Sequence, residues 1–284
     1  MRRTRPCRHR RAGGFTLIEA VLVIVMTGAL FATVAHFIVP PVQAHLATTA
    51  RAQLVDQADL ALRRIGRDLR GALPNSARVS ASGLALELIP TSAGARYVAE
   101  GTNRLQFGTL ATSFDLVGPP LALTAGQDVV FYNLGPGVTG SDAYAANGSA
   151  TEQASSNRRS TSNGAGSFSS ITLVSSAGLP VAANAAPYRV LAVDPPVSYR
   201  CDLTAGTLTR YSGYGFQATQ PDPPATGSSA VLASGVTACR FAYDATVTAS
   251  RAGLVQMQLT LATTTSAGTE RIALHHAVHV DNLP

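Results

Sequence analysis

The sequence contains neither tryptophan nor lysine, and charged residues make up only 13% of it. The net charge of +6 has a single origin, because residues 1–14 hold six arginines and no acidic residue. Without those six, 16 of the 22 basic residues remain, and they balance the 16 acidic residues. A neutral remainder argues against a nucleic-acid-binding protein, since phosphate contacts need clustered cations. The basic character therefore belongs to a leader and not to a binding surface.

The motifs of common enzyme classes are also missing. The chain has no Gly-x-Ser-x-Gly turn, His-Glu-x-x-His pair, Walker loop or Rossmann fingerprint. Sequence order does not reveal a catalytic triad assembled from residues far apart in the chain, so this enzymatic arrangement stays open. Residues His275 and His279 share one face of a predicted strand but lie two pleats apart, too far for one metal ion without a third ligand. No EF-hand spacing is present, and we expect no enzymatic activity, cofactor or metal site.

One long hydrophobic run covers residues 15–39, with the sequence FTLIEAVLVIVMTGALFATVAHFIV. A bilayer core requires about 20 apolar residues in a helix, and flanking arginines stay on the cytoplasmic side. The sequence therefore predicts a membrane span over about 15–39, with a cytoplasmic N-terminus and the rest of the chain outside. A cleaved secretory signal is the alternative. Signal peptidase cuts after the apolar run at a small-residue site, whereas this run is longer than a usual signal core and leads into further helix.

A helical pattern continues after the apolar run. Pro40 and Pro41 are expected to kink or interrupt the helix. Beyond them, apolar residues recur every three or four positions, as on one face of an amphipathic helix. This stripe consists of Leu46, Ala50, Leu54, Ala58, Ala61, Ile65, Leu69 and Leu73. Because a proline disfavours helical geometry in the preceding residue, Pro74 predicts that the helix ends near Leu73.

From residue 74 onward the pattern changes to short strands separated by turns. Strands are predicted at 78–80, 84–89, 96–99, 104–107, 129–133, 171–174, 188–193, 197–202, 207–211, 238–243, 254–262 and 270–280. Residues 135–170 are rich in Gly, Ser, Asn and Ala, so we expect a long surface loop with Arg158 and Arg159 in solvent. One long helix followed by many strands predicts an α+β fold. The expected layout is a helix over 15–73 packed on an antiparallel β-rich globular domain over 74–284.

The three cysteines divide between the two parts of the chain. Cys7 lies in the basic leader, whereas Cys201 and Cys239 lie in the strand-rich region. An even pair in an exported domain indicates a disulfide, because exported proteins meet an oxidising compartment. Two buried free thiols are the alternative, since free cysteine is commonly buried.

The start of the apolar run carries a specific motif, GGFTLIE at residues 13–19. It closely resembles the processing signal of type IV pilins and type II secretion pseudopilins. The resemblance implies that a prepilin peptidase removes residues 1–14 after Gly14 and methylates the new N-terminal Phe15. It also implies a pilin-like fold, a role for Glu19 in assembly, and four kinds of partner: the peptidase, other major and minor pilins, the inner membrane and an assembly platform.

Glu19 is unusual on physical grounds as well. A carboxylate four residues inside an apolar segment costs several kcal/mol unless it is paired or near the interface. A residue that reaches back to the cytoplasmic surface is the alternative interpretation. That alternative leaves the neighbouring Gly14–Phe15 boundary without an explanation, so the resemblance favours a functional carboxylate.

Patchier similarity extends to the rest of the chain. The segments RDLRGALPNS (67–76), VSYRC (197–201), LTRY (208–211), VTACRFAYD (236–244) and HVDNLP (279–284) resemble minor pilins of MSHA-type (mannose-sensitive haemagglutinin) pili. In size and layout the chain also resembles the J-type minor pseudopilins of type II secretion. The resemblance implies a minor subunit that aids filament assembly or forms the tip. Such a subunit is first a single-pass inner-membrane protein with a periplasmic domain, and then part of an extracellular filament.

Overall fold

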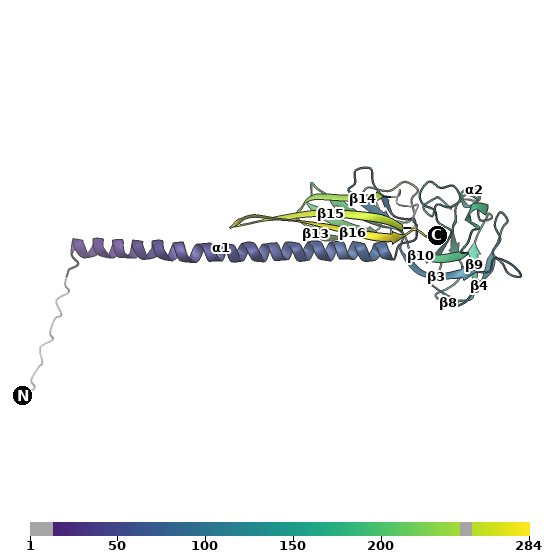
Figure 1. Ribbon diagram of the computed structural model, residues 1–284, viewed down its shortest axis with the longest axis horizontal. Coiled ribbons are helices and arrows are strands. Elements are labelled where there is room, and N and C mark those ends of the chain that lie inside the picture. The colour runs from purple at the N-terminus through teal and green to yellow at the C-terminus, as the bar shows by residue number, and fades with distance from the viewer. Residues whose placement is uncertain (1–13, 245–251) are drawn as a thin grey trace, which may run out of the picture.

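The computed structural model describes residues 14–244 and 252–284. Most of the predicted leader, including Cys7, lies outside these residues. Figure 1 shows an elongated molecule in which one long helix projects from a β-rich domain that covers its C-terminal half. This arrangement of one helix and antiparallel strands confirms the α+β class predicted from the sequence.

The helical segments are α1 (Leu17–Arg70), α2 (Ala150–Gln153) and the 3₁₀ turn η1 (Val181–Ala183). The strands are β1 (Arg78–Val79), β2 (Ala85–Leu88), β3 (Thr91–Tyr97), β4 (Ser113–Val117), β5 (Leu121–Leu123), β6 (Asp128–Phe131), β7 (Arg158–Thr161), β8 (Gly166–Phe168), β9 (Ser170–Val174), β10 (Arg189–Val193), β11 (Val197–Asp202), β12 (Thr207–Ser212), β13 (Ser228–Ser234), β14 (Val236–Asp244), β15 (Ala252–Thr265) and β16 (Gly268–Asp281).

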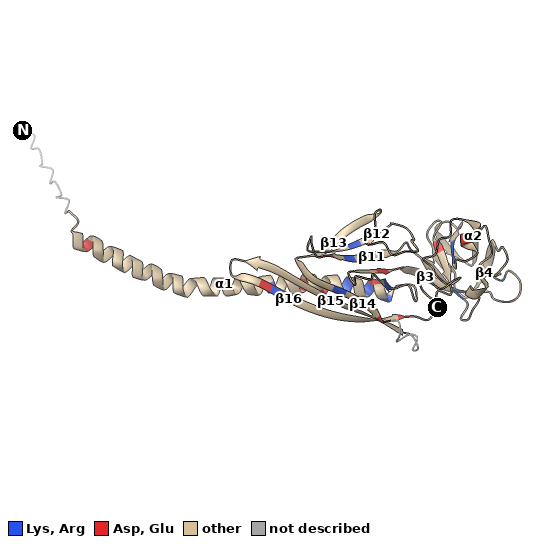
Figure 2. Cartoon of the chain, turned by 90° about the horizontal axis from the view of Figure 1, so that it is seen from above, with Lys and Arg blue, Asp and Glu red and all other residues tan. Residues whose placement is uncertain are grey.

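Helix α1 is a single element of 54 residues, and Pro40 and Pro41 lie inside it. The expected interruption is therefore wrong. Each proline removes one backbone donor, but this part of the helix is exposed on all sides, so the freed carbonyl groups can tilt outward. Figure 2 shows a gentle curve along this half of α1; a kink at the two prolines stays a prediction.

The helix ends slightly before the predicted position. The backbone N–H of Gly71 closes the last turn on the Arg67 carbonyl, and the N–H of Leu73 instead donates to the Ile89 carbonyl at 2.7 Å. The backbone after the helix thus pairs with the segment that follows β2. A local helical pattern does not reveal such a distant contact.

Two antiparallel sheets cover one face of the C-terminal half of α1. The first has the strand order β1-β2-β11-β12-β13, and the second has the order β14-β15-β16. Their inner faces and one face of α1 form a single hydrophobic core. The helix contributes Ala50, Leu54, Ala58, Ala61, Leu62, Ile65, Gly66 and Leu69 as buried residues.

The predicted stripe of α1 is thus confirmed from Ala50 to Leu69 but not at its first and last members. Leu73 lies beyond the end of the helix and is buried in a separate apolar cluster. Leu46 is 42% exposed, because the β15–β16 hairpin meets the helix one turn later. There Arg51 Nη2 contacts Glu270 Oε2 at 2.8 Å.

The far end of the molecule is a closed barrel, which the sequence did not predict. Its strands follow the order β10-β3-β4-β9-β7-β6. Aromatic rings fill its interior edge to face: Tyr97 lies 5.9 Å from Phe131, and Phe114 lies 5.7 Å from Phe131. A smaller apolar cluster that includes Leu73 and Tyr144 joins the barrel to the end of α1.

The predicted surface loop over residues 135–170 is wrong in part. It contains α2, β7, β8 and the start of β9, and Arg158 and Arg159 are buried instead of solvated. Arg158 pairs with Asp128 at 2.6 Å, and its guanidinium stacks 3.7 Å above the ring of Phe216. The polar composition of this segment suggested a solvated loop. In the structure, the arginine side chains instead donate to buried backbone carbonyl oxygens, which apolar side chains would leave unpaired.

Arg159 shows the same effect without an acidic partner. Its guanidinium donates to the carbonyl oxygens of Gln153 at 2.7 Å and Ser156 at 2.9 Å, among others. Burial, together with the charge of Arg158, lowers the pKa of Arg159 to about 10. This side chain therefore fastens the segment around α2 to the barrel.

Other local predictions had mixed outcomes. Strands β1 and β2 pair antiparallel as a hairpin, and so do β11 and β12, as predicted. The segment 104–107 is no strand, since only Phe107 forms an isolated bridge, to Leu179. Strands β4, β5 and β13 were not predicted, because they are short or carry many small polar residues.

Candidate functional site

The predicted processing site lies directly before α1. Gly14 and Phe15 are outside the helix and exposed, with Phe15 at 73%. A Cβ atom added to Gly14 would have no neighbour within 4 Å. The described residues therefore leave the Gly14–Phe15 peptide bond accessible to an enzyme.

Glu19 lies in the first turn of α1 and is exposed. Its backbone N–H donates to the Thr16 side-chain oxygen at 3.3 Å, so Thr16 caps the helix. An acidic side chain here also interacts favourably with the helix dipole. Sequence reasoning missed this structural role, although the Thr-x-x-Glu spacing at 16–19 is a known signal for a helix start.

The N-terminal half of α1 presents an uncovered apolar surface. Its most hydrophobic window has a mean hydropathy of 2.3, and none of it is buried against the rest of the molecule. Glu19 is the only Asp, Glu, Lys or Arg residue between positions 15 and 50, and in Figure 2 the blue and red residues gather where the sheets begin. The helix is long and apolar enough to cross a membrane.

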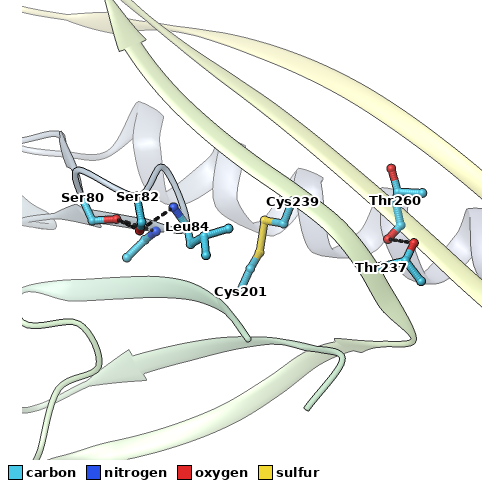
Figure 3. The surroundings of a disulfide bond; sticks show 8 residues. Ser80, Ser82, Leu84, Cys201, Thr237, Cys239 and Thr260 are labelled. Atoms are coloured by element: carbon cyan, nitrogen blue, oxygen red, sulfur yellow. Dashed lines mark hydrogen bonds between the residues drawn. A yellow bond between two sulfur atoms is a disulfide. The ribbon is translucent and has the colours of Figure 1, made fainter. Parts of the chain in front are cut away.

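The structure confirms the predicted disulfide between Cys201 and Cys239. Cys201 lies on β11 and Cys239 on β14, so the bond joins the two sheets across the core, as Figure 3 shows. Their Cα atoms lie 6.3 Å apart, within the range for a disulfide. The alternative of two free thiols is therefore excluded in this structure.

A buried polar cluster around Glu87 was not predicted. The Glu87 carboxylate accepts from Arg78 at 2.5 Å and from the Tyr214 hydroxyl at 2.6 Å. Burial raises the pKa of Glu87, and the charge of Arg78 opposes this shift. Arg78 also lies 3.6 Å above the ring of Tyr144 and donates to the Gln217 carbonyl. The cluster holds the Pro-rich segment before β13 in place.

A second polar link joins α1 to the five-stranded sheet. The hydroxyl of Tyr199 donates to Asp68, and Arg210 and Arg64 each contact the same carboxylate at 3.4 Å. Burial raises the pKa of Tyr199, and the nearby Asp68 charge adds to this shift. The phenol therefore stays protonated and keeps donating, which fixes the helix against β11.

The side chains of His275, His276 and His279, all on β16, do not point to a common site. His276 faces α1, and its Nε2 atom would lie 3.3 Å from a Cβ added to Gly66. His275 and His279 are exposed on the opposite face of the strand. Among residues 14–244 and 252–284, no group of three His, Cys, Asp or Glu side chains could hold a metal ion.

Comparison with known proteins returned no family model, no curated protein and no solved structure that matches this chain. The residues and geometry nevertheless define a class of architecture. It is a long N-terminal helix, bare and apolar in its first half, whose second half packs with one face on two disulfide-linked sheets.

Proposed function

We propose that this chain is a minor pilin of a type IV, MSHA-like pilus, made as a precursor that is cleaved between Gly14 and Phe15. One observation carries the proposal: the GGFTLIE motif lies at the exposed boundary of a continuous helix whose first half is apolar and uncovered. In this proposal, Phe15 becomes the methylated N-terminus and the helix stays with the mature protein.

The bare half of α1 supports assembly as the mechanism. More than a dozen large apolar side chains between Phe15 and Val39 are exposed. Their burial requires lipid or neighbouring helices, since uncovered apolar surface is costly in water. The inner membrane covers this surface before assembly, and helices of other major and minor pilins cover it in the filament. The prepilin peptidase and an assembly platform act at the membrane stage.

The charges and the disulfide support a consistent orientation. The arginines of the leader would remain cytoplasmic, whereas the Cys201–Cys239 bond requires an oxidising compartment for the β domain. The protein is thus proposed to be a single-pass inner-membrane protein with a periplasmic domain, which later leaves the cell within a pilus.

A minor role fits the size of the β domain, which carries a whole barrel beyond the sheets that hold α1. Such a subunit would aid initiation or form the tip of the filament. A J-type minor pseudopilin of type II secretion is the second candidate, favoured by the same size and layout. The neighbouring genes separate the two: an MSHA-type cluster supports the pilus, and a secretin cluster with other minor pseudopilins supports secretion.

Intact-mass analysis of the membrane-bound protein tests the proposal. We expect a mature chain that begins with N-methyl-Phe15 in cells with a prepilin peptidase, and the full precursor in cells without it. A mature terminus beyond Ala44 would show ordinary signal-peptidase processing and would overturn the pilin assignment. Detection of the tagged protein in sheared filaments then tests incorporation.

A further inference from the structure

Two arginines lie side by side on the outer surface of the barrel. Arg189 on β10 and Arg96 on β3 are direct partners in the antiparallel ladder, and both are exposed. Like charges directly opposite on one sheet face destabilise the pairing. Such a pair lowers its free energy when an anion lies between the two guanidinium groups.

Nothing in the described structure neutralises these two side chains. Within residues 14–244 and 252–284, neither guanidinium makes a hydrogen bond or an ion pair. On the same face of the sheet, Asp115 lies two positions before Val117, the β4 partner of Arg96. Its carboxylate accepts from Asn103 at 3.0 Å. The guanidinium N–H donors of Arg96 and Arg189 therefore remain available.

A hollow lies beside this pair, and Gly94 is one of the residues that line it. Gly94 lies in the interior of β3, opposite Leu191 of β10, and is exposed. A Cβ atom on Gly94 would lie only 2.8 Å from the Leu191 Cδ2 atom, so Leu191 occupies the space that a larger residue would need. Gly94 therefore makes room for the Leu191 side chain, which also lines the hollow.

The hollow has the size and chemistry of a small-ligand site. Its volume is about 440 Å³, within the range of small-molecule pockets. Val117, Pro119 and Leu191 supply apolar walls, and Arg96 and Arg189 are the charged residues that line it. The hollow thus combines two neighbouring cations with an apolar surface.

We propose that this hollow binds a small organic oxyanion, such as a sugar carrying a carboxylate, sulfate or phosphate group. The two guanidinium groups hold the oxyanion, since their planar donors match its oxygens in pairs. The carbon skeleton of the ligand lies against Val117, Pro119 and Leu191. The site is on the barrel, at the end of the molecule away from the N-terminus (Figure 1), where a filament subunit would meet external ligands.

Titration calorimetry on the full chain in detergent tests this site. The probes are glucuronate, glucose 6-phosphate and the uncharged control glucose. We expect binding of at least one of the two anions and none of glucose, with affinity that falls as salt is raised. Preference between the two anions distinguishes a carboxylate ligand from a phosphate ligand, and either preference supports the site.

Three variants locate the binding. Arg96→Gln and Arg189→Gln should each weaken anion binding by about tenfold or more, since each removes charge-assisted hydrogen bonds. Arg271→Gln is the matched control, because Arg271 is exposed on β16, away from the barrel, and lines no part of the hollow. Thermal unfolding without ligand shows whether the variants fold, and removal of one of two like charges should leave the melting temperature unchanged or raise it.

The proposal is overturned if neither anion binds, if glucose binds equally well, or if folded Arg96→Gln and Arg189→Gln bind like the wild type. Loss of binding in Arg271→Gln as well would show nonspecific charge attraction and would also overturn it. These outcomes are independent of the proposed filament role, which depends on the N-terminal helix and is tested by its processing.

Discussion

Glu19 has one role in the structure and a second role in the proposed filament. In the isolated chain it occupies the first turn of a helix capped by Thr16, where a negative charge is favourable. In the proposed filament, its carboxylate would meet the charged amine of Phe15 on a neighbouring subunit, so that two costly charges neutralise each other in the bilayer. Such a contact would also fix the axial register of neighbouring helices.

Substitutions of Glu19 separate these roles. We expect Glu19→Val to be inserted and cleaved but to fail to enter filaments, and Glu19→Asp to retain more function. Glu19→Gln keeps a polar side chain in the first turn but removes the charge, so it should assemble as poorly as Glu19→Val if the charge pair matters. Blots for processing and immunodetection in sheared filaments measure both steps. Normal incorporation of Glu19→Val would show that the charge-pair account is wrong.

The buried carboxylate of Glu87 gives a second prediction for a single residue. Glu87→Gln should destabilise the domain by about 3–5 kcal/mol, because it leaves the buried guanidinium of Arg78 without its ion-pair partner. Glu100→Gln is the control, since Glu100 is exposed, and its effect should stay within about 0.5 kcal/mol. Urea unfolding of the purified chain measures both variants. Equal midpoints for the two would contradict a structural role for the Glu87 cluster.

At the scale of elements, the sequence predicted what depends on local periodicity. The buried stripe of α1 from Ala50 to Leu69 follows the three- and four-residue spacing of a helix, and the β11–β12 hairpin follows a turn signal between two strands. The disulfide also followed from simple counting of cysteines. These features need little knowledge of distant parts of the chain.

The barrel was not predicted, because its strands are short and its pairing is nonlocal. Strand β3 pairs with β10, about a hundred residues later, and β7 lies in a segment of polar composition. Arg158 and Arg159 show why this part of the fold was missed. Two adjacent arginines indicate a solvated loop, and only the folded structure shows that Asp128 and carbonyl oxygens surround them. For the candidate site, the motif identified Gly14, Phe15 and Glu19, whereas the Thr16 cap appeared only with the helix boundary.

The two faces of α1 allow a matched test within one element. Leu69 is 1% exposed and lies in the core, whereas Leu60 is 68% exposed on the opposite face. Leu69→Ala should destabilise the domain by about 2–5 kcal/mol through loss of buried contacts and creation of a cavity. Leu60→Ala should change stability by no more than about 0.5 kcal/mol. If unfolding experiments show equal losses, the helix does not pack against the sheets as described.

At the scale of the whole molecule, the disulfide determines how firmly the two sheets stay together. The sequence separation of Cys201 and Cys239 is 38 residues. In the chain-entropy model, closing a loop of this length stabilises the folded state by about 4 kcal/mol. The double variant Cys201→Ser and Cys239→Ser should lose up to that amount in chemical unfolding. The wild type under reducing conditions should show the same loss, and an unchanged midpoint in both cases would contradict the prediction.

The contact between Arg51 and Glu270 has a consequence for how the chain is made. These residues are 219 positions apart in the sequence, and the helix that emerges early packs on β15 and β16, which emerge last. The part of the apolar face of α1 that packs on these two strands therefore stays uncovered until the end of synthesis. Nonlocal contacts of this kind form slowly, so we expect the domain to complete its folding only when the β15–β16 hairpin packs on the helix. A chain released before β15 would expose apolar helix surface to proteases and chaperones.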